Sequence, residues 1–68
     1  AVDDPEVAAI LRYIHEHLSQ PLRVRDVLRA FPADRRRIER KFRDTVGRPL
    51  VAEIRRVRLE QARRLLVT

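Results

Sequence analysis

Apolar residues in this 68-residue chain recur three and four positions apart, the spacing of one helix face, in segments separated by proline or glycine. No segment alternates apolar and polar residues as a strand does, and Gly47 is the only glycine. The apolar positions of the first two segments are Val7, Ile10, Leu11, Ile14 and Leu18, then Val24, Val27, Leu28 and Phe31. The pattern therefore predicts an all-α fold of four helices.

Local signals predict where these helices begin and end. Asp4 is suited to cap a first helix that carries Pro5 in its first turn and ends at Ser-Gln-Pro, residues 19–21. Pro32 closes the second helix, and Asp34 can cap the third through its carboxylate. We therefore expect a tight corner between the second and third helices.

A longer fourth helix is expected over residues 50–66, because Gly47 fits the position after a helix end and Pro49 prevents simple continuation. Its apolar stripe comprises Ile54, Leu59, Ala62, Leu65 and Leu66. We interpret residues 1–4 as a frayed linker and residues 5–68 as one small module.

Charge is unevenly distributed along the chain, whose net charge is +6 and whose pI is about 11.4. Residues 1–20 hold one base and four acids, whereas residues 21–68 hold fifteen bases and six acids. Fifteen of the sixteen bases are arginine, which pairs bidentately with phosphate or guanine, although a coding bias toward arginine would give the same ratio. The clustering indicates a nucleic-acid partner.

The third predicted helix, from Asp34 to Val46, breaks two electrostatic rules. Three arginines, residues 35–37, occupy its first turn, where the helix dipole disfavours cations. Arg36 and Arg40 are like charges four residues apart, which costs roughly 0.2–0.5 kcal/mol. Its two faces are an apolar one of Ile38, Phe42, Thr45 and Val46 and a cationic one of Arg36, Arg37, Arg40 and Arg43. A polyanion along the cationic face would reverse both penalties.

Several classes of protein are disfavoured. The chain has no cysteine, and His15 and His17 diverge on a helix, so we expect no metal site and no cofactor. No Ser-His-acid set or phosphate-binding glycine loop is present, so we expect no enzyme. No apolar run approaches a membrane span, and the first residues lack signal-peptide character, so we expect a soluble, intracellular chain.

Two short helices with a tight corner and a cationic second helix form the helix-turn-helix arrangement, whose second helix enters the DNA major groove. Within this pattern, residues 10–66 resemble the AraC/XylS family of bacterial transcription regulators. The resemblance is carried by Tyr13-Ile14, Leu18, Pro21-Leu22, Phe42-Arg43, Gly47, Arg58, Leu59, Ala62, Leu65 and Leu66.

The resemblance implies a four-helix, homeodomain-like module, the first of two helix-turn-helix subdomains, with residues 50–66 as the connecting helix. It also implies cytoplasmic, nucleoid-associated action, and a second subdomain and an effector-sensing domain missing from this chain. Spacing over 24–28 and 38–42 is similar to that of xylose-operon regulators, which carry a sugar-binding domain upstream. Three departures are Pro32 at the usual corner glycine, Arg23 at a usual Ser or Thr cap, and Glu53 at a frequent aromatic position.

Mapped by the family pattern, Arg36, Glu39 and Arg40 face base edges. Arginine there pairs with guanine O6 and N7, or else contacts only phosphate. Glu39 would accept from cytosine N4, or would instead orient Arg35 or Arg43 through an intrahelical ion pair. The expected phosphate contacts, whose alternative is an ordinary solvated face, are Arg35, Arg37, Lys41 and Arg43.

Three further expectations remain open. The different-class alternative to DNA binding is a protein-interaction module whose basic face binds an acidic partner. RNA binding is disfavoured because the three aromatic residues are needed for the core. Arg58 is expected to snorkel or to pair with a carboxylate, and part of the fourth helix to dock on the absent second half or else to be buried within this module.

Overall fold

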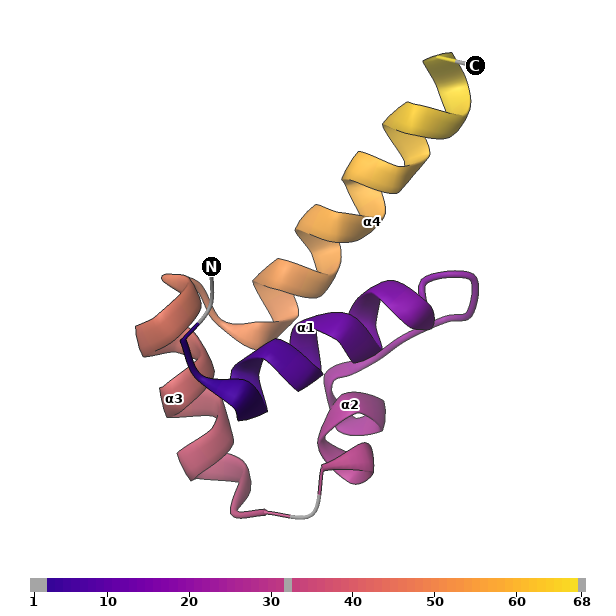
Figure 1. The fold of residues 1–68 in the computed structure, drawn as a ribbon. Coiled ribbons are helices and arrows are strands. Elements are labelled where there is room, and N and C mark those ends of the chain that lie inside the picture. Colours follow the sequence, from indigo (N-terminus) through magenta and orange to yellow (C-terminus); the bar gives the residue numbers. More distant parts are fainter. Residues whose placement is uncertain (1–2, 32, 68) are drawn as a thin grey trace.

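The computed structural model describes residues 3–31 and 33–67 and is all-helical over those residues, without a strand. Figure 1 shows three helices grouped around one another and a fourth that leaves the group. They are α1 (Pro5–Glu16), α2 (Val24–Ala30), α3 (Arg35–Val46) and α4 (Leu50–Val67). The predicted all-α fold of four helices is confirmed.

Helix α1 begins as predicted and ends two residues early. The Asp4 carboxylate accepts the backbone N–H groups of Glu6 (2.9 Å) and Val7 (3.2 Å), which otherwise have no partner in the first turn. At the other end, the His17 ring lies on Tyr13, and its Nδ1 is 2.8 Å from the Tyr13 carbonyl oxygen. That local contact accompanies the end of the helix at Glu16, before the expected Leu18.

Helix α2 begins at Val24, the first apolar position of the predicted pattern, despite an arginine at its cap position. The backbone N–H of Arg23 donates to the carboxylate of Asp26, the third residue of the helix, at 3.0 Å. This hydrogen bond is one of the two that make up a capping box. The helix ends at Ala30, and Phe31 is extended. Pro32, the expected terminator and the departure from the family's corner glycine, lies outside the described residues.

Helix α3 has both predicted caps. The Asp34 carboxylate accepts from the N–H groups of Arg36 (2.9 Å) and Arg37 (3.3 Å). Gly47 follows the helix with φ of 88° and donates its N–H to the Arg43 carbonyl at 2.8 Å. Positive φ at this position favours glycine. The Asp34 cap and Gly47 therefore account for the start and the end of α3, which agree with the predicted bounds.

One apolar core joins all four helices. Its buried members are Val7, Ile10, Ile14, Leu22, Val27, Ile38, Phe42, Leu50, Ile54 and Val57. The predicted apolar face of α3 is confirmed at Ile38 and Phe42 and is wrong at Thr45, which is exposed because it lies at the edge of that face.

The expected stripe of α4 is buried only at its start. Of its five positions only Ile54 enters the core, beside Leu50 and Val57, which were not in the expected stripe. Leu59, Leu65 and Leu66 are 56%, 72% and 86% exposed, and Ala62 is exposed as well. Figure 1 shows the reason: the C-terminal half of α4 extends beyond the other helices. Burial of the whole stripe within this module is therefore excluded.

Candidate nucleic-acid interface

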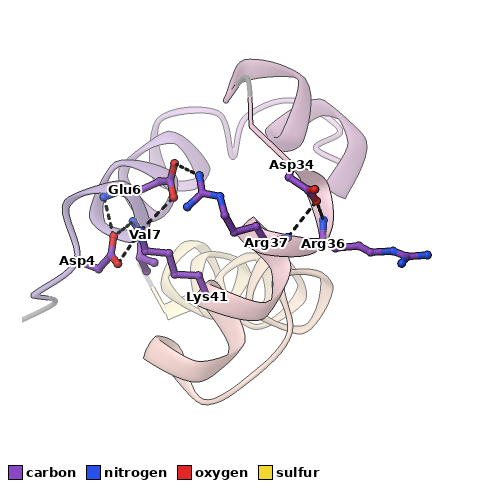
Figure 2. A network of polar contacts seen from close by, with 7 residues as sticks. All are labelled: Asp4, Glu6, Val7, Asp34, Arg36, Arg37 and Lys41. Atoms are coloured by element: carbon purple, nitrogen blue, oxygen red, sulfur yellow. Dashed lines mark hydrogen bonds and ion pairs between the residues drawn. The ribbon is translucent and has the colours of Figure 1, made fainter.

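The cationic face of α3 is turned outward by two buried anchors. Ile38 and Phe42 are 1% and 0% exposed, so the rotation of the helix about its axis is determined by the core. Arg36, Arg40 and Arg43 are all exposed, and none of them forms an ion pair with a described residue. In Figure 2 the Arg36 side chain points away from the helices. The predicted outward placement of these guanidinium groups is confirmed.

Glu39 lies beside this group and pairs within the helix. Its Oε1 is 3.6 Å from Nε of Arg35, at the i,i+4 spacing. The side chains of Arg35 and Glu39 are 68% and 39% exposed, so the pair orients Arg35 and adds little stability. The expected intrahelical pairing is found with Arg35, whereas no such pair joins Glu39 to Arg43.

Arg37 and Lys41 face a different direction, toward the start of α1 (Figure 2). Lys41 Nζ is 2.9 Å from an Asp4 oxygen and 3.3 Å from a Glu6 oxygen, and Arg37 Nη2 is 3.3 Å from the other Glu6 oxygen. The ammonium beside Asp4 lowers the pKa of that carboxyl, and Asp4, followed by Glu6, raises the pKa of Lys41. Three of the four expected phosphate contacts therefore already have acidic partners: Arg37 and Lys41 at the start of α1, and Arg35 within α3.

An open hollow lies beside the outward arginines, between the start of α2, the middle of α3 and the start of α4. Its lining is Val24, Glu39, Arg40, Arg43, Asp44, Pro49, Leu50 and Val51. Arg40 and Arg43 thus lie both on the outer face of α3 and at this hollow.

Glu53 is buried at the start of α4, 3% exposed, and is held by two arginines. Its carboxylate accepts from Arg56 at 2.9 and 3.0 Å and from Arg48 at 3.1 Å. Arg56, followed by Arg48, lowers the pKa of this carboxyl against the opposing effect of burial. These bonds allow an acid at a position where the related family often has an aromatic residue.

The Glu53 pair continues along α4 as a row of alternating charges. Arg56 also binds Glu60 at 3.1 Å, and Glu60 binds Arg64 at 3.3 Å. Sequence reasoning did not identify this row, although the three- and four-residue spacing of its charges was visible in the sequence.

Arg58 lies on another side of α4. Its Nη2 donates to the backbone carbonyl of Gln20 at 3.1 Å, and it pairs with no described carboxylate. Of the two alternatives expected for Arg58, the carboxylate partner is not found among the described residues, and the guanidinium instead reaches a carbonyl of the loop after α1. Arg58 therefore joins α4 to this loop.

Residues 3–31 and 33–67 contain no group of three or more His, Cys, Asp or Glu side chains able to hold a metal ion. None of the described helices has the length and apolar character needed to cross a membrane.

Comparison with known proteins extends the resemblance to the whole chain. It is 34% identical over all 68 residues to the xylose operon regulatory protein of Escherichia coli K12, and equally to those of strains O6:H1 and O157:H7. The chain is similar to a helix-turn-helix segment of an AraC-type regulator. It spans 17% of the length of these relatives. No protein-family model and no solved structure matches it.

The AraC-type similarity and the geometry agree on the region of interest. The relatives are operon regulatory proteins by name, and the short α2 followed by the outward cationic α3 is consistent with a helix-turn-helix module. The predicted resemblance, including its xylose-operon subgroup, is therefore confirmed.

Proposed function

We propose that this chain is a sequence-specific DNA-binding module of a bacterial transcription regulator. Helix α3 enters the major groove, and α2 crosses the backbone. The observation that carries the proposal is the outward set of Arg36, Arg40 and Arg43, held by Ile38 and Phe42 and without described acidic partners. The similarity to xylose operon regulatory proteins supports it.

Within this proposal, Arg36 and Arg40 read base edges, and guanine is the base that arginine matches best. Glu39 accompanies them and orients Arg35 through their ion pair. The groups assigned to phosphate are Arg35, Arg37, Lys41 and Arg43. Phosphate contacts position the helix without specifying sequence.

The module is proposed to be the N-terminal half of a bipartite DNA-binding unit, acting in the cytoplasm on the nucleoid. Residues 50–66 connect it to a second helix-turn-helix subdomain, and an effector-sensing domain completes the regulator. The exposed Leu59, Leu65 and Leu66 on the projecting half of α4 support docking of that second subdomain. The proposed role is binding, not catalysis.

A salt titration tests DNA binding against binding of an acidic protein partner. Phosphate binding makes the logarithm of affinity for any duplex fall linearly with the logarithm of salt concentration. Arg43→Ala should reduce that slope by about 1. Fluorescence anisotropy with a labelled duplex measures it.

The matched control is Arg12→Ala, which removes an exposed arginine of α1 and lowers the net charge equally. It should leave the slope near that of the unmodified chain. Equal slopes for both variants, or binding to an acidic polypeptide and to no duplex, would overturn the proposal.

A further inference from the structure

The contact between the start of α1 and one edge of α3 brings two acids and two bases together (Figure 2). Lys41 lies between Asp4 and Glu6, at 2.9 and 3.3 Å, and Arg37 lies 3.3 Å from Glu6. The formal charges of these four groups cancel. The two acids lie at the start of α1 and the two bases lie on α3, so the tertiary fold brings the opposite charges together.

Capping of α1 does not require these charges. One oxygen of Asp4, Oδ1, accepts the N–H groups of Glu6 and Val7, and the other, Oδ2, contacts Lys41. An asparagine caps a helix as well as an aspartate does. The second oxygen is therefore available for an electrostatic function.

The ion pairs are also placed to exchange with solvent or with another anion. The Arg37 and Lys41 side chains are 55% and 34% exposed, and those of Asp4 and Glu6 are 22% and 28% exposed. Partly exposed pairs contribute little to stability. Buried apolar residues such as Val7 and Ile38 already hold these helices together.

We propose that Asp4 and Glu6 compete with DNA phosphates for Arg37 and Lys41, so that this edge of α3 binds a duplex weakly until the ion pairs are exchanged. The inference rests on the proposed DNA-binding function and adds an intramolecular restraint to it. A carboxylate and a phosphate oxygen accept from the same donors, and the acids repel a phosphate brought beside them.

The restraint affects sequence-independent binding more than base reading. Arg36, which points away from the acids, and Arg40 have no described ion-pair partner and stay available to base edges. Fewer free cations mean fewer counterions released from DNA, which lowers affinity for every sequence and flattens the salt dependence. The ratio of specific to non-specific affinity should stay nearly unchanged, because phosphate contacts contribute about equally to binding of every sequence.

The test compares two double variants that add the same net charge. Asp4→Asn with Glu6→Gln removes both competing carboxylates and retains a capping residue. Asp3→Asn with Glu16→Gln removes two carboxylates that form no ion pair with a described residue. Each variant is titrated by anisotropy with a mixed-sequence duplex two helical turns long, across a series of salt concentrations.

The first variant should bind about five- to tenfold more tightly at low salt, with a slope steeper by about 1 to 2. The control should change the slope by less than half as much. Glu6→Gln alone leaves the cap untouched and should give a smaller change in the same direction, which guards against loss of folding in the double variant.

The outcomes separate this inference from the function on which it rests. Salt-dependent binding by the unmodified chain, with equal slopes for the two double variants, would overturn the competition and leave DNA binding intact. Absence of salt-dependent binding by the unmodified chain and all variants would overturn both.

Discussion

At the scale of single residues, the arginines of α3 differ in what surrounds them, not in chemistry. Arg36, Arg40 and Arg43 project without described acidic partners, whereas Arg37 is engaged by Glu6 and Arg35 by Glu39. The same side chain is thus available at some positions and engaged at others. We therefore propose different roles for neighbouring arginines.

Replacement of Arg40 by alanine should relax the preference for one base position and leave the others unchanged. A bidentate arginine–guanine contact discriminates against the wrong base by about 1–3 kcal/mol. Selection of bound duplexes from a randomised pool, followed by sequencing, measures the preference. Equal weakening for all sequences would show that Arg40 contacts only phosphate.

Glu53 should make the stability of the fold depend on pH. Arg56, then Arg48, holds the pKa of this carboxyl below its ordinary value of 4.5, so the unfolded chain takes up its proton more readily than the folded chain does. The contribution of this group is therefore fully present above pH 4.5 and lost as the pH falls through the lower folded value.

The matching variant is Glu53→Gln, which should cost roughly 1–2 kcal/mol of unfolding free energy at neutral pH. Its difference from the unmodified chain should shrink as the pH falls below 4.5. Urea unfolding followed by circular dichroism measures both, with the more exposed Glu60→Gln as control. A difference that stays constant with pH would contradict this role.

At the scale of elements, short-range signals determined what could be predicted from sequence. The caps at Asp4, Asp34 and Gly47 act within a few residues, so the starts of α1 and α3 and the end of α3 were predicted correctly. The end of α1 was missed because it accompanies a ring contact between Tyr13 and His17. The spacing of apolar residues also did not show that only the first half of α4 packs against the other helices.

Gly47 is the element boundary most sensitive to substitution. Its φ is 88°, and a β-carbon there would meet no atom within 4 Å, so the cost of alanine comes from the backbone alone. Gly47→Ala should destabilise the fold by about 1 kcal/mol in urea unfolding. Gly47→Asn, which tolerates positive φ better, should retain more stability. Equal losses of stability in the two variants would show that the positive φ of Gly47 is not the cause of the destabilisation.

At the scale of the whole molecule, the candidate site depends on contacts that no local pattern predicts. Arg37 and Lys41 bind Glu6 from 31 and 35 residues away in the chain. The sequence placed four acids in residues 1–20 and a basic helix later, but only the fold shows which acids meet which bases. The outward face was predictable because helical period and two apolar anchors determine it.

The molecule as a whole presents one small core and one projecting helix. A single module makes few phosphate contacts, so we expect the isolated chain to bind DNA weakly. In the proposed bipartite unit, a second module would reach an adjacent groove about 34 Å away and add avidity. We therefore expect strong DNA binding only from the proposed pair of modules.

The most direct test is to map the DNA contact onto the chain by nuclear magnetic resonance. Backbone amide shifts are recorded while a duplex is added at low salt. The outward face of α3 predicts the largest changes at Arg36, Arg40 and Arg43, with small changes over residues 55–64 of α4, which carry five exposed arginines of their own. Largest changes on α4, with α3 unaffected, would contradict the proposal.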